Sequence, residues 1–155
     1  LVGSEMCIRD SCAGISDGLG LGDNAKSALV TRGLAEMVRL GTALGGKPET
    51  FQGLSGVGDL IVTCYSSYSR NNRVGRLIGE GKSLTEIMSS MNMVAEGVPN
   101  TISFYESTKK HQVNTPIIDQ AYEMIENGKK PDKALQDLLS RDLKAETDYE
   151  VCVCI

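Results

Sequence analysis

The sequence predicts an all-α protein with a single helical domain. Apolar residues recur at the three- and four-residue spacing of helices, and no segment alternates between apolar and polar residues as a half-buried strand would. The 155 residues carry no repeat or low-complexity linker that would divide them. A chain of this length buries ~68–70% of the surface that it exposes when unfolded, so one core of packed helices is expected.

Glycine and proline mark the elements of the first half of the chain. Gly, Asp and Asn dominate residues 14–24, which predicts a loop. The apolar positions that follow predict a long helix that ends near Leu44 at a Gly-Gly pair. Pro48 is typical of the first turn of a short new helix. The next stretch places apolar side chains at helical offsets and predicts another helix: Leu54, Val57, Leu60, Ile61 and Cys64.

Capping residues mark the elements of the second half. Ser69 is expected to cap a helix with three arginines on one side, and residues 83–86 have the capping-box pattern of another helix. Prolines indicate the helices that are expected over the remainder of the chain: residues 99–111, 116–127 and 131 onwards. The last of these should bury four apolar side chains: Ala134, Leu135, Leu138 and Leu139.

Composition and charge argue against several classes of function. The net charge is −4 and the basic residues are scattered except around Arg70, Arg73 and Arg76, so a nucleic-acid partner is not expected. Aromatic residues make up only 5% and Trp is absent, which disfavours stacking on single-stranded bases. No apolar run approaches the ~20 residues of a membrane span, and a cytoplasmic protein is expected.

The cysteines do not indicate a metal site. There are five, an odd number without CxxC spacing, and the single histidine, His111, is expected at the surface. Cys64 is typical of a small core residue in a reducing compartment. Two closely spaced pairs leave a redox or metal role open as the alternative: Cys7 with Cys12, and Cys152 with Cys154.

Both ends of the chain differ from the rest. Residues 1–12 look like a translated sequencing adapter joined to a truncated reading frame, and they are set apart from the expected fold. Residues 148–155 form a tail that is suspect for the same reason. No secretion-signal pattern opens the chain. The expected domain is therefore residues 13–147.

Two polar segments suggest a binding site. Asp59 lies on an apolar segment ten residues before Ser69-Arg70-Asn71. A carboxylate can orient hydroxyl groups, and an Arg with backbone N–H groups at a helix start can hold a phosphate. Thr63 lies one turn after Asp59 and can support the same site through its hydroxyl. The alternative is that Asp59 only stabilises a first helical turn and Arg70 is solvated.

A glycine motif requires a separate interpretation. Residues 20–25 fit the loose dinucleotide-binding pattern G-x-G-x-x-A, but no hydrophobic strand leads into them. Asp23 would also repel a pyrophosphate at the helix start. A tight turn into a helix capped by Asp or Asn is expected here instead.

Together with residues 14–26 and 93–97, these segments resemble the C-terminal domain of bacterial-type NAD(P)-dependent glycerol-3-phosphate dehydrogenase. The resemblance runs from about Ala13 to about Glu146. It implies a fold like the C-terminal domain of 6-phosphogluconate dehydrogenase. It also implies a parent enzyme that reduces dihydroxyacetone phosphate to sn-glycerol 3-phosphate with NADH or NADPH, runs the reverse oxidation, and feeds glycerophospholipid synthesis.

The resemblance assigns roles to individual residues. It implies substrate contacts by Asp59, Ser69, Arg70 and Asn71, and cofactor contacts by three residues: Arg70, Val94 and Glu96. In the family, the catalytic Lys stands eight residues before the equivalent of Gly14, which falls on Met6 in this chain. The catalytic base is therefore absent. Lys26 is the nearest substitute in sequence, and it is expected to be solvated.

Two other functions stay open at this point. The chain could be a non-catalytic helical domain for dimerisation or for binding a phosphorylated metabolite. It could also be the substrate domain of a related hydroxyacid dehydrogenase. Neither a nucleotide-binding fold nor the catalytic Lys is encoded, so the chain alone is expected to be inactive. Apolar surface left by the missing half keeps a homodimer open.

Overall fold

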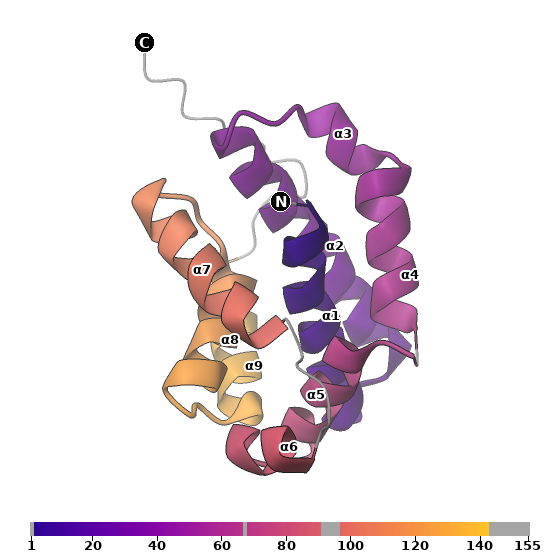
Figure 1. Ribbon diagram of the computed structural model, residues 1–155, viewed down its shortest axis with the longest axis vertical. Coiled ribbons are helices and arrows are strands. Elements are labelled where there is room, and N and C mark those ends of the chain that lie inside the picture. The colour runs from indigo at the N-terminus through magenta and orange to yellow at the C-terminus, as the bar shows by residue number, and fades with distance from the viewer. Residues whose placement is uncertain (1, 67, 91–96, 143–155) are drawn as a thin grey trace.

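The structure is a computed structural model that describes the backbone of residues 2–66, 68–90 and 97–142 and the side chains from Cys7 onwards. Every regular element in this part of the chain is a helix, which confirms the predicted fold class. In Figure 1, α1 (Val2–Gly18) lies in the middle of the molecule, α3 and α4 lie on one side of it, and α7 to α9 lie on the other. Helices α5 and α6 close the bottom of this view.

The central position of α1 differs from the sequence prediction in two ways. Residues 14–18 belong to this helix instead of a loop, and Ile8 and Ala13 are fully buried, so residues 8–13 lie inside the core. The helix packs most extensively against α5 (Arg70–Gly79). A Cβ atom on Gly14 would lie 2.0 Å from the Asn72 carbonyl oxygen. Gly14 and Gly18, two of the glycines that suggested a loop, therefore serve close packing between two helices.

Helix α2 (Gly22–Ala43) follows a tight turn in which Gly20 and Gly22 have positive φ angles of 70° and 77°. The predicted Asp or Asn cap is wrong, because the N-cap position is Leu21 and no described side chain caps the helix. Asp23 instead lies in the first turn, where the helix dipole favours a negative charge. The predicted end near Leu44 is confirmed, with Gly45 at a φ of 88°.

The helix predicted over residues 54–64 is divided into two elements. Helix α3 (Pro48–Gln52) is followed by the π-helical turn η1 (Leu54–Gly58) and then by α4 (Asp59–Tyr65). Leu60 and Cys64 pack into the core with Ala13. Two members of the predicted stripe are exposed instead: Leu54 at 90% and Ile61 at 49%. The chain turns back on α3 at Gly56, where a Cβ atom would lie 2.1 Å from the Phe51 carbonyl oxygen.

The cap signals of the second half are confirmed. The Ser69 hydroxyl accepts the N–H of Asn72 at 3.3 Å and caps α5. Before α6 (Leu84–Ser90), the Ser83 N–H donates to Glu86 at 2.9 Å and the Glu86 N–H donates to the Ser83 hydroxyl at 3.3 Å. Ile87 of α6 packs against Val74 of α5.

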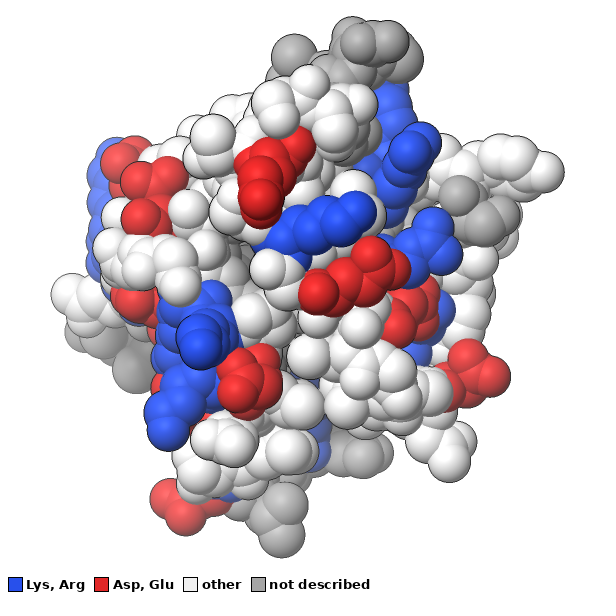
Figure 2. All heavy atoms as spheres, turned by 90° about the horizontal axis from the view of Figure 1, so that it is seen from below, with Lys and Arg blue, Asp and Glu red and all other residues white. Residues whose placement is uncertain are grey.

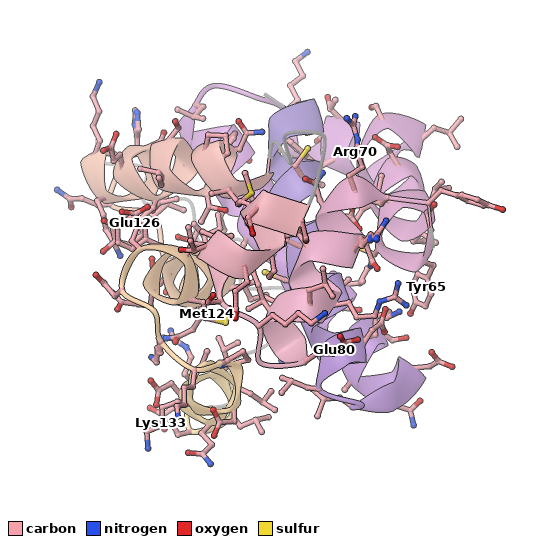
Figure 3. The ribbon with its side chains drawn as sticks, turned by 60° about the horizontal axis from the view of Figure 1, so that its bottom comes forward. Tyr65, Arg70, Glu80, Met124, Glu126 and Lys133 are labelled. Carbon is pink, nitrogen blue, oxygen red and sulfur yellow. The ribbon has the colours of Figure 1, made fainter. Side chains whose placement is uncertain are left out.

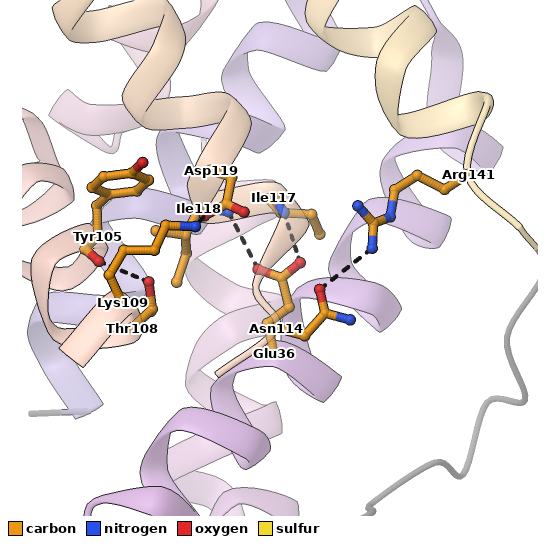
Figure 4. A network of polar contacts seen from close by, with 9 residues as sticks. All are labelled: Glu36, Tyr105, Thr108, Lys109, Asn114, Ile117, Ile118, Asp119 and Arg141. Carbon is orange, nitrogen blue, oxygen red and sulfur yellow. Dashed lines mark hydrogen bonds and ion pairs between the residues drawn. The ribbon is translucent and has the colours of Figure 1, made fainter. Parts of the chain in front are cut away.

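Helices α7 (Gly97–Lys110), α8 (Pro116–Glu126) and α9 (Pro131–Leu139) complete the fold. The buried carboxylate of Glu36 on α2 accepts the N–H groups of Ile117 and Ile118 at 2.7 and 3.3 Å, so it caps α8 from another helix (Figure 4). Ala134 of α9 is buried as predicted, but Leu139 is 75% exposed. In the last turn of α9, Leu138 therefore packs against the core and Leu139 does not.

Within the described residues, no helix combines the length and apolar character that a bilayer crossing requires. The same part of the chain holds no group of three or more potential metal ligands. On the face shown in Figure 2, positive and negative side chains are interspersed.

Candidate functional site

The N-terminus of α5 forms the cationic half of the candidate site. Arg70 is exposed, and Figure 3 shows it on the same side of the molecule as Tyr65, away from Met124 and Glu126 of α8. The side-chain oxygen of Asn71 accepts the N–H of Gly97 at 3.0 Å. Asn71 therefore fixes the beginning of α7 against the beginning of α5.

A carboxylate of the chain itself lies at this helix start. The Ser69 hydroxyl donates to the Asp10 carboxylate, and burial raises the pKa of Asp10 to about 6 although Ser69 and Asn72 hydrogen bonds act in the opposite direction. A helix N-terminus attracts negative charge in this way. The sequence interpretation missed Asp10 because residues 1–12 had been set apart.

Helix α4 forms the acidic half of the candidate site. Asp59 is its first residue and is partly buried, as is Thr63 one turn later. The Thr63 hydroxyl lies 2.9 Å from the main-chain oxygen of Asp59 and 3.2 Å from that of Leu60, and it donates to this pair. Its proton is thus used within the helix, and only its lone pairs could serve a ligand.

The two halves meet at the connection between α4 and α5. Both helices pack against α1. The Asn72 side-chain amide donates to the Cys64 carbonyl at 3.4 Å and so joins the start of α5 to the end of α4. The fold thereby packs both helices against α1, with the contact between them at the end of α4 that is opposite Asp59.

Residues 11–136 match the family described as the C-terminus of NAD-dependent glycerol-3-phosphate dehydrogenase. The chain belongs to this family. It is 50% identical over 149 residues to glycerol-3-phosphate dehydrogenase (NAD(P)+) of Chlorobium phaeobacteroides, covering 96% of this chain and 45% of the relative. It is 56% identical over 134 residues to the enzyme of the same name from Geobacillus thermodenitrificans, covering 86% of this chain and 39% of the relative.

Solved structures of glycerol-3-phosphate dehydrogenases share the fold. The crystal structure from Coxiella burnetii matches with a TM-score of 0.87 and 42% identity, over 90% of this chain and 43% of that one. The Saccharomyces cerevisiae enzyme matches with a TM-score of 0.80 and 28% identity, over 91% of this chain and 41% of that one. This glycerol-3-phosphate dehydrogenase C-terminal domain therefore spans less than half the length of the relatives that it matches.

Other residues singled out in the sequence have different outcomes. Met6, which the sequence resemblance aligns with the family's Lys, lies in α1, and its side chain is outside the described part. Val94 and Glu96 also lie outside the described residues. His111 is exposed as predicted.

The thiols of Cys12 and Cys64 are buried, and burial raises the pKa of each to about 12, which disfavours a reactive thiolate.

The prediction of a solvated Lys26 is wrong. Its side chain is only 9% exposed, and its Nζ lies 2.6 Å from Oδ2 of Asp17. The sequence places Asp17 nine residues earlier, on the other side of the glycine turn. Because that region was interpreted as a loop, the pairing across the turn was missed.

Proposed function

We propose that this chain is the substrate-binding part of an enzyme that interconverts dihydroxyacetone phosphate and sn-glycerol 3-phosphate with NADH or NADPH. The observation that carries the proposal is that a chain of this family packs α4, which begins at Asp59, beside a capped, cationic helix start at α5. Such an arrangement offers a carboxylate for hydroxyl groups and an Arg with N–H donors for a phosphate. In this proposal the parent enzyme is cytoplasmic, residues 13–147 belong to its substrate domain, and Ile8 and Cys12 complete the core of that domain in this chain.

The proposed roles follow from the chemistry of each side chain. Arg70 pairs with the phosphate through its planar guanidinium, and the Asn71 amide contributes a hydrogen bond at the same helix start. Ser69 contributes one by donating its hydroxyl proton to the phosphate in place of Asp10. Asp59 orients the hydroxyl end of the substrate. The domain contributes positioning and electrostatics, while the hydride belongs to the nicotinamide cofactor.

The described residues do not by themselves form a dinucleotide site. Residues 20–25 follow helix α1 instead of a strand, so the structural context of a dinucleotide-binding loop is not met. We therefore assign most of the cofactor site to the part of the parent enzyme outside this chain. Arg70, Val94 and Glu96 are the proposed contributions of this domain to it.

The proposal is tested in a restored enzyme. The nucleotide-binding half and the Lys-containing segment of the Geobacillus thermodenitrificans relative are joined to residues 13–142 of this chain, and kcat/KM is measured with dihydroxyacetone phosphate. Asp59→Asn should lower kcat/KM about 10- to 150-fold, since a hydrogen bond to a charged group contributes ~1.5–3 kcal/mol. Asp23→Asn removes an exposed carboxylate from another first helical turn and serves as the matched control.

The outcomes separate the competing functions. An inactive chimera that still binds phosphate would favour a non-catalytic binding module. Preference for an unphosphorylated hydroxy acid would favour a related dehydrogenase. An Asp59→Asn variant within twofold of the parent would remove Asp59 from the site.

A further inference from the structure

A cluster of four polar side chains joins three helices at one end of α4. The Nζ of Lys26 lies 2.5 and 2.6 Å from the two carboxylate oxygens of Asp17, and 5.1 Å from the centre of the Tyr65 ring. The Tyr65 hydroxyl lies 2.8 Å from the Ser27 hydroxyl. We call Asp17, Lys26, Ser27 and Tyr65 the Lys26 cluster. It connects the end of α1, the first turns of α2 and the last residue of α4.

The Lys26 ammonium has little freedom in this cluster. A charge taken out of water is costly unless it is paired, and here the pairing is a carboxylate on one helix and an aromatic face on another. Displacing Tyr65 would remove the aromatic face and the contact with Ser27 together. The cluster therefore fixes the place of the Tyr65 ring relative to α1 and α2.

The place of Tyr65 determines how α4 is rotated about its own axis. Successive residues of a helix are about 100° apart. The buried face of α4 consists of Leu60 and Cys64. Asp59 and Thr63 each come one residue earlier and lie on one flank, whereas Tyr65 comes one residue after Cys64 and lies on the opposite flank. A contact that holds Tyr65 in place thus resists rotation of α4 about its axis, and so keeps the flank that carries Asp59 in place.

The other attachments of α4 are the packing of Leu60 and Cys64 into the core and the hydrogen bond from Asn72 to the Cys64 carbonyl. The helix has seven residues, and its outward side includes Val62 at 67% exposure and Ile61 at 49%. The polar contacts of Tyr65 add an attachment on the flank opposite Asp59.

We propose that Lys26 and Tyr65 are positioning residues, which hold α4 at the rotation that directs Asp59 toward the substrate. This inference rests on the proposed function and gives Lys26 a role without contact to the reacting atoms. It also explains why a lysine is buried beside the substrate-binding helix instead of being solvated.

The test uses the chimeric enzyme with Lys26→Met, Lys26→Arg and Tyr65→Phe. Lys26→Met removes the charge and should lower kcat with dihydroxyacetone phosphate about 10- to 100-fold, the effect of a small misplacement of a substrate-orienting group. Lys26→Arg keeps a cation between the carboxylate and the ring and should restore most of the loss. Tyr65→Phe keeps the ring under Lys26 but loses the Ser27 contact, so it should give a smaller decrease.

A matched control exists at the other side of the molecule. Lys109 pairs with Asp119 at 2.9 Å and lies 4.7 Å from the centre of the Tyr105 ring, so it makes the same two kinds of contact between α7 and α8 (Figure 4). Lys109→Met should leave kcat and KM within twofold of the parent. Thermal unfolding of every variant shows which losses come from unfolding; if Lys26→Met does not fold, Lys26→Arg and Tyr65→Phe carry the test.

A double variant shows whether Lys26 acts through Asp59. In the Asp59→Asn background, Lys26→Met should lower kcat less than threefold, because the group that it positions is already lost. Equal losses in both backgrounds, or folded Lys26 and Tyr65 variants within twofold of the parent, would overturn the inference and leave the proposed function intact. A parent chimera without turnover would overturn both.

Discussion

Arg70 and Arg76 are both exposed on α5, so the side chains differ in their distance from the helix start more than in their solvation. Only Arg70 lies beside the capped first turn, where backbone N–H groups add to a guanidinium. In the restored enzyme, Arg70→Ala should lower kcat/KM for the phosphorylated substrate about 10- to 150-fold, and Arg76→Ala should have little effect.

The substitution Arg70→Lys distinguishes fork geometry from charge. An ammonium keeps the positive charge but cannot make two parallel hydrogen bonds to a phosphate, so it should recover only part of the loss. Steady-state kinetics with all three variants decide the matter. If Arg70→Ala, Arg70→Lys and Arg76→Ala gave nearly equal kinetics, Arg70 would be a solvated surface residue.

Glu36 gives a residue-scale prediction about pH. Burial raises its pKa from 4.5 to about 7, although the Ile117 and Ile118 N–H groups and the charges of Arg9 and Arg39 act in the opposite direction. The folded state then binds a proton more tightly than the unfolded chain. The stability contributed by this proton is complete below pH 4.5 and is lost as the pH rises toward 7, a change of about 3 kcal/mol.

Glu36→Gln should flatten this part of the stability profile, because a glutamine has no proton to lose. Urea unfolding of both proteins at several pH values between 4.5 and 7.5 measures the difference in slope. Asp10, with a pKa raised to about 6 by burial, contributes a slope of the same sign to both proteins and cancels in the comparison. Parallel profiles would mean that Glu36 ionises normally in the folded state.

At the scale of elements, the close approach of α1 and α5 depends on glycine. Propensity alone says that Gly14→Ala should stabilise a helix interior by ~0.5–1 kcal/mol. The added Cβ would instead lie 2.0 Å from the Asn72 carbonyl oxygen, a backbone atom that cannot rotate away. We expect a net destabilisation of about 1–3 kcal/mol. At Gly53 such a Cβ would lie 3.7 Å from the Thr50 carbonyl oxygen, an ordinary contact, so Gly53→Ala is the matched control.

Thermal unfolding of both variants checks this prediction. Gly14→Ala should lower Tm by several degrees, and Gly53→Ala should leave it nearly unchanged. A Tm for Gly14→Ala at or above that of the parent would show that the two helices move apart at little cost.

The success of the sequence interpretation varied with the range of the interactions involved. The caps at Ser69 and Ser83 are local, since a side chain bonds an N–H three residues away, and both were predicted. The π-helical turn after α3 brings Gly56 against the Phe51 carbonyl five residues earlier, and it was missed because apolar spacing does not distinguish it from an α-helical turn. The glycine-rich end of α1 has the composition of a loop. Only the packing of these glycines against α5 distinguishes the helix from a loop.

The candidate site shows the same division. That α4 and α5 adjoin could be predicted because a short stretch of chain links them. The grouping of Asp59 with the α5 start rests on the resemblance to a known family and stays a prediction. The exposure of Leu54 and Ile61 could not be predicted. Apolar periodicity indicates which residues share a helix face, but not whether another element covers that face. The same limit applies to Lys26, whose burial depends on α1, α2 and α4 meeting at one point.

At the scale of the whole molecule, the chain by itself should not catalyse the reaction of its parent. It spans less than half of its relatives, residues 20–25 follow a helix instead of the strand of a dinucleotide-binding loop, and the resemblance places the family's Lys at Met6. A purified sample should show no oxidation of NADH or NADPH dependent on dihydroxyacetone phosphate. Met6→Lys alone should not change this result. A restored base can exchange a proton, but without a bound cofactor there is no hydride donor. Turnover above a heat-treated control would contradict the prediction, and the chimera described above serves as the positive control in the same assay.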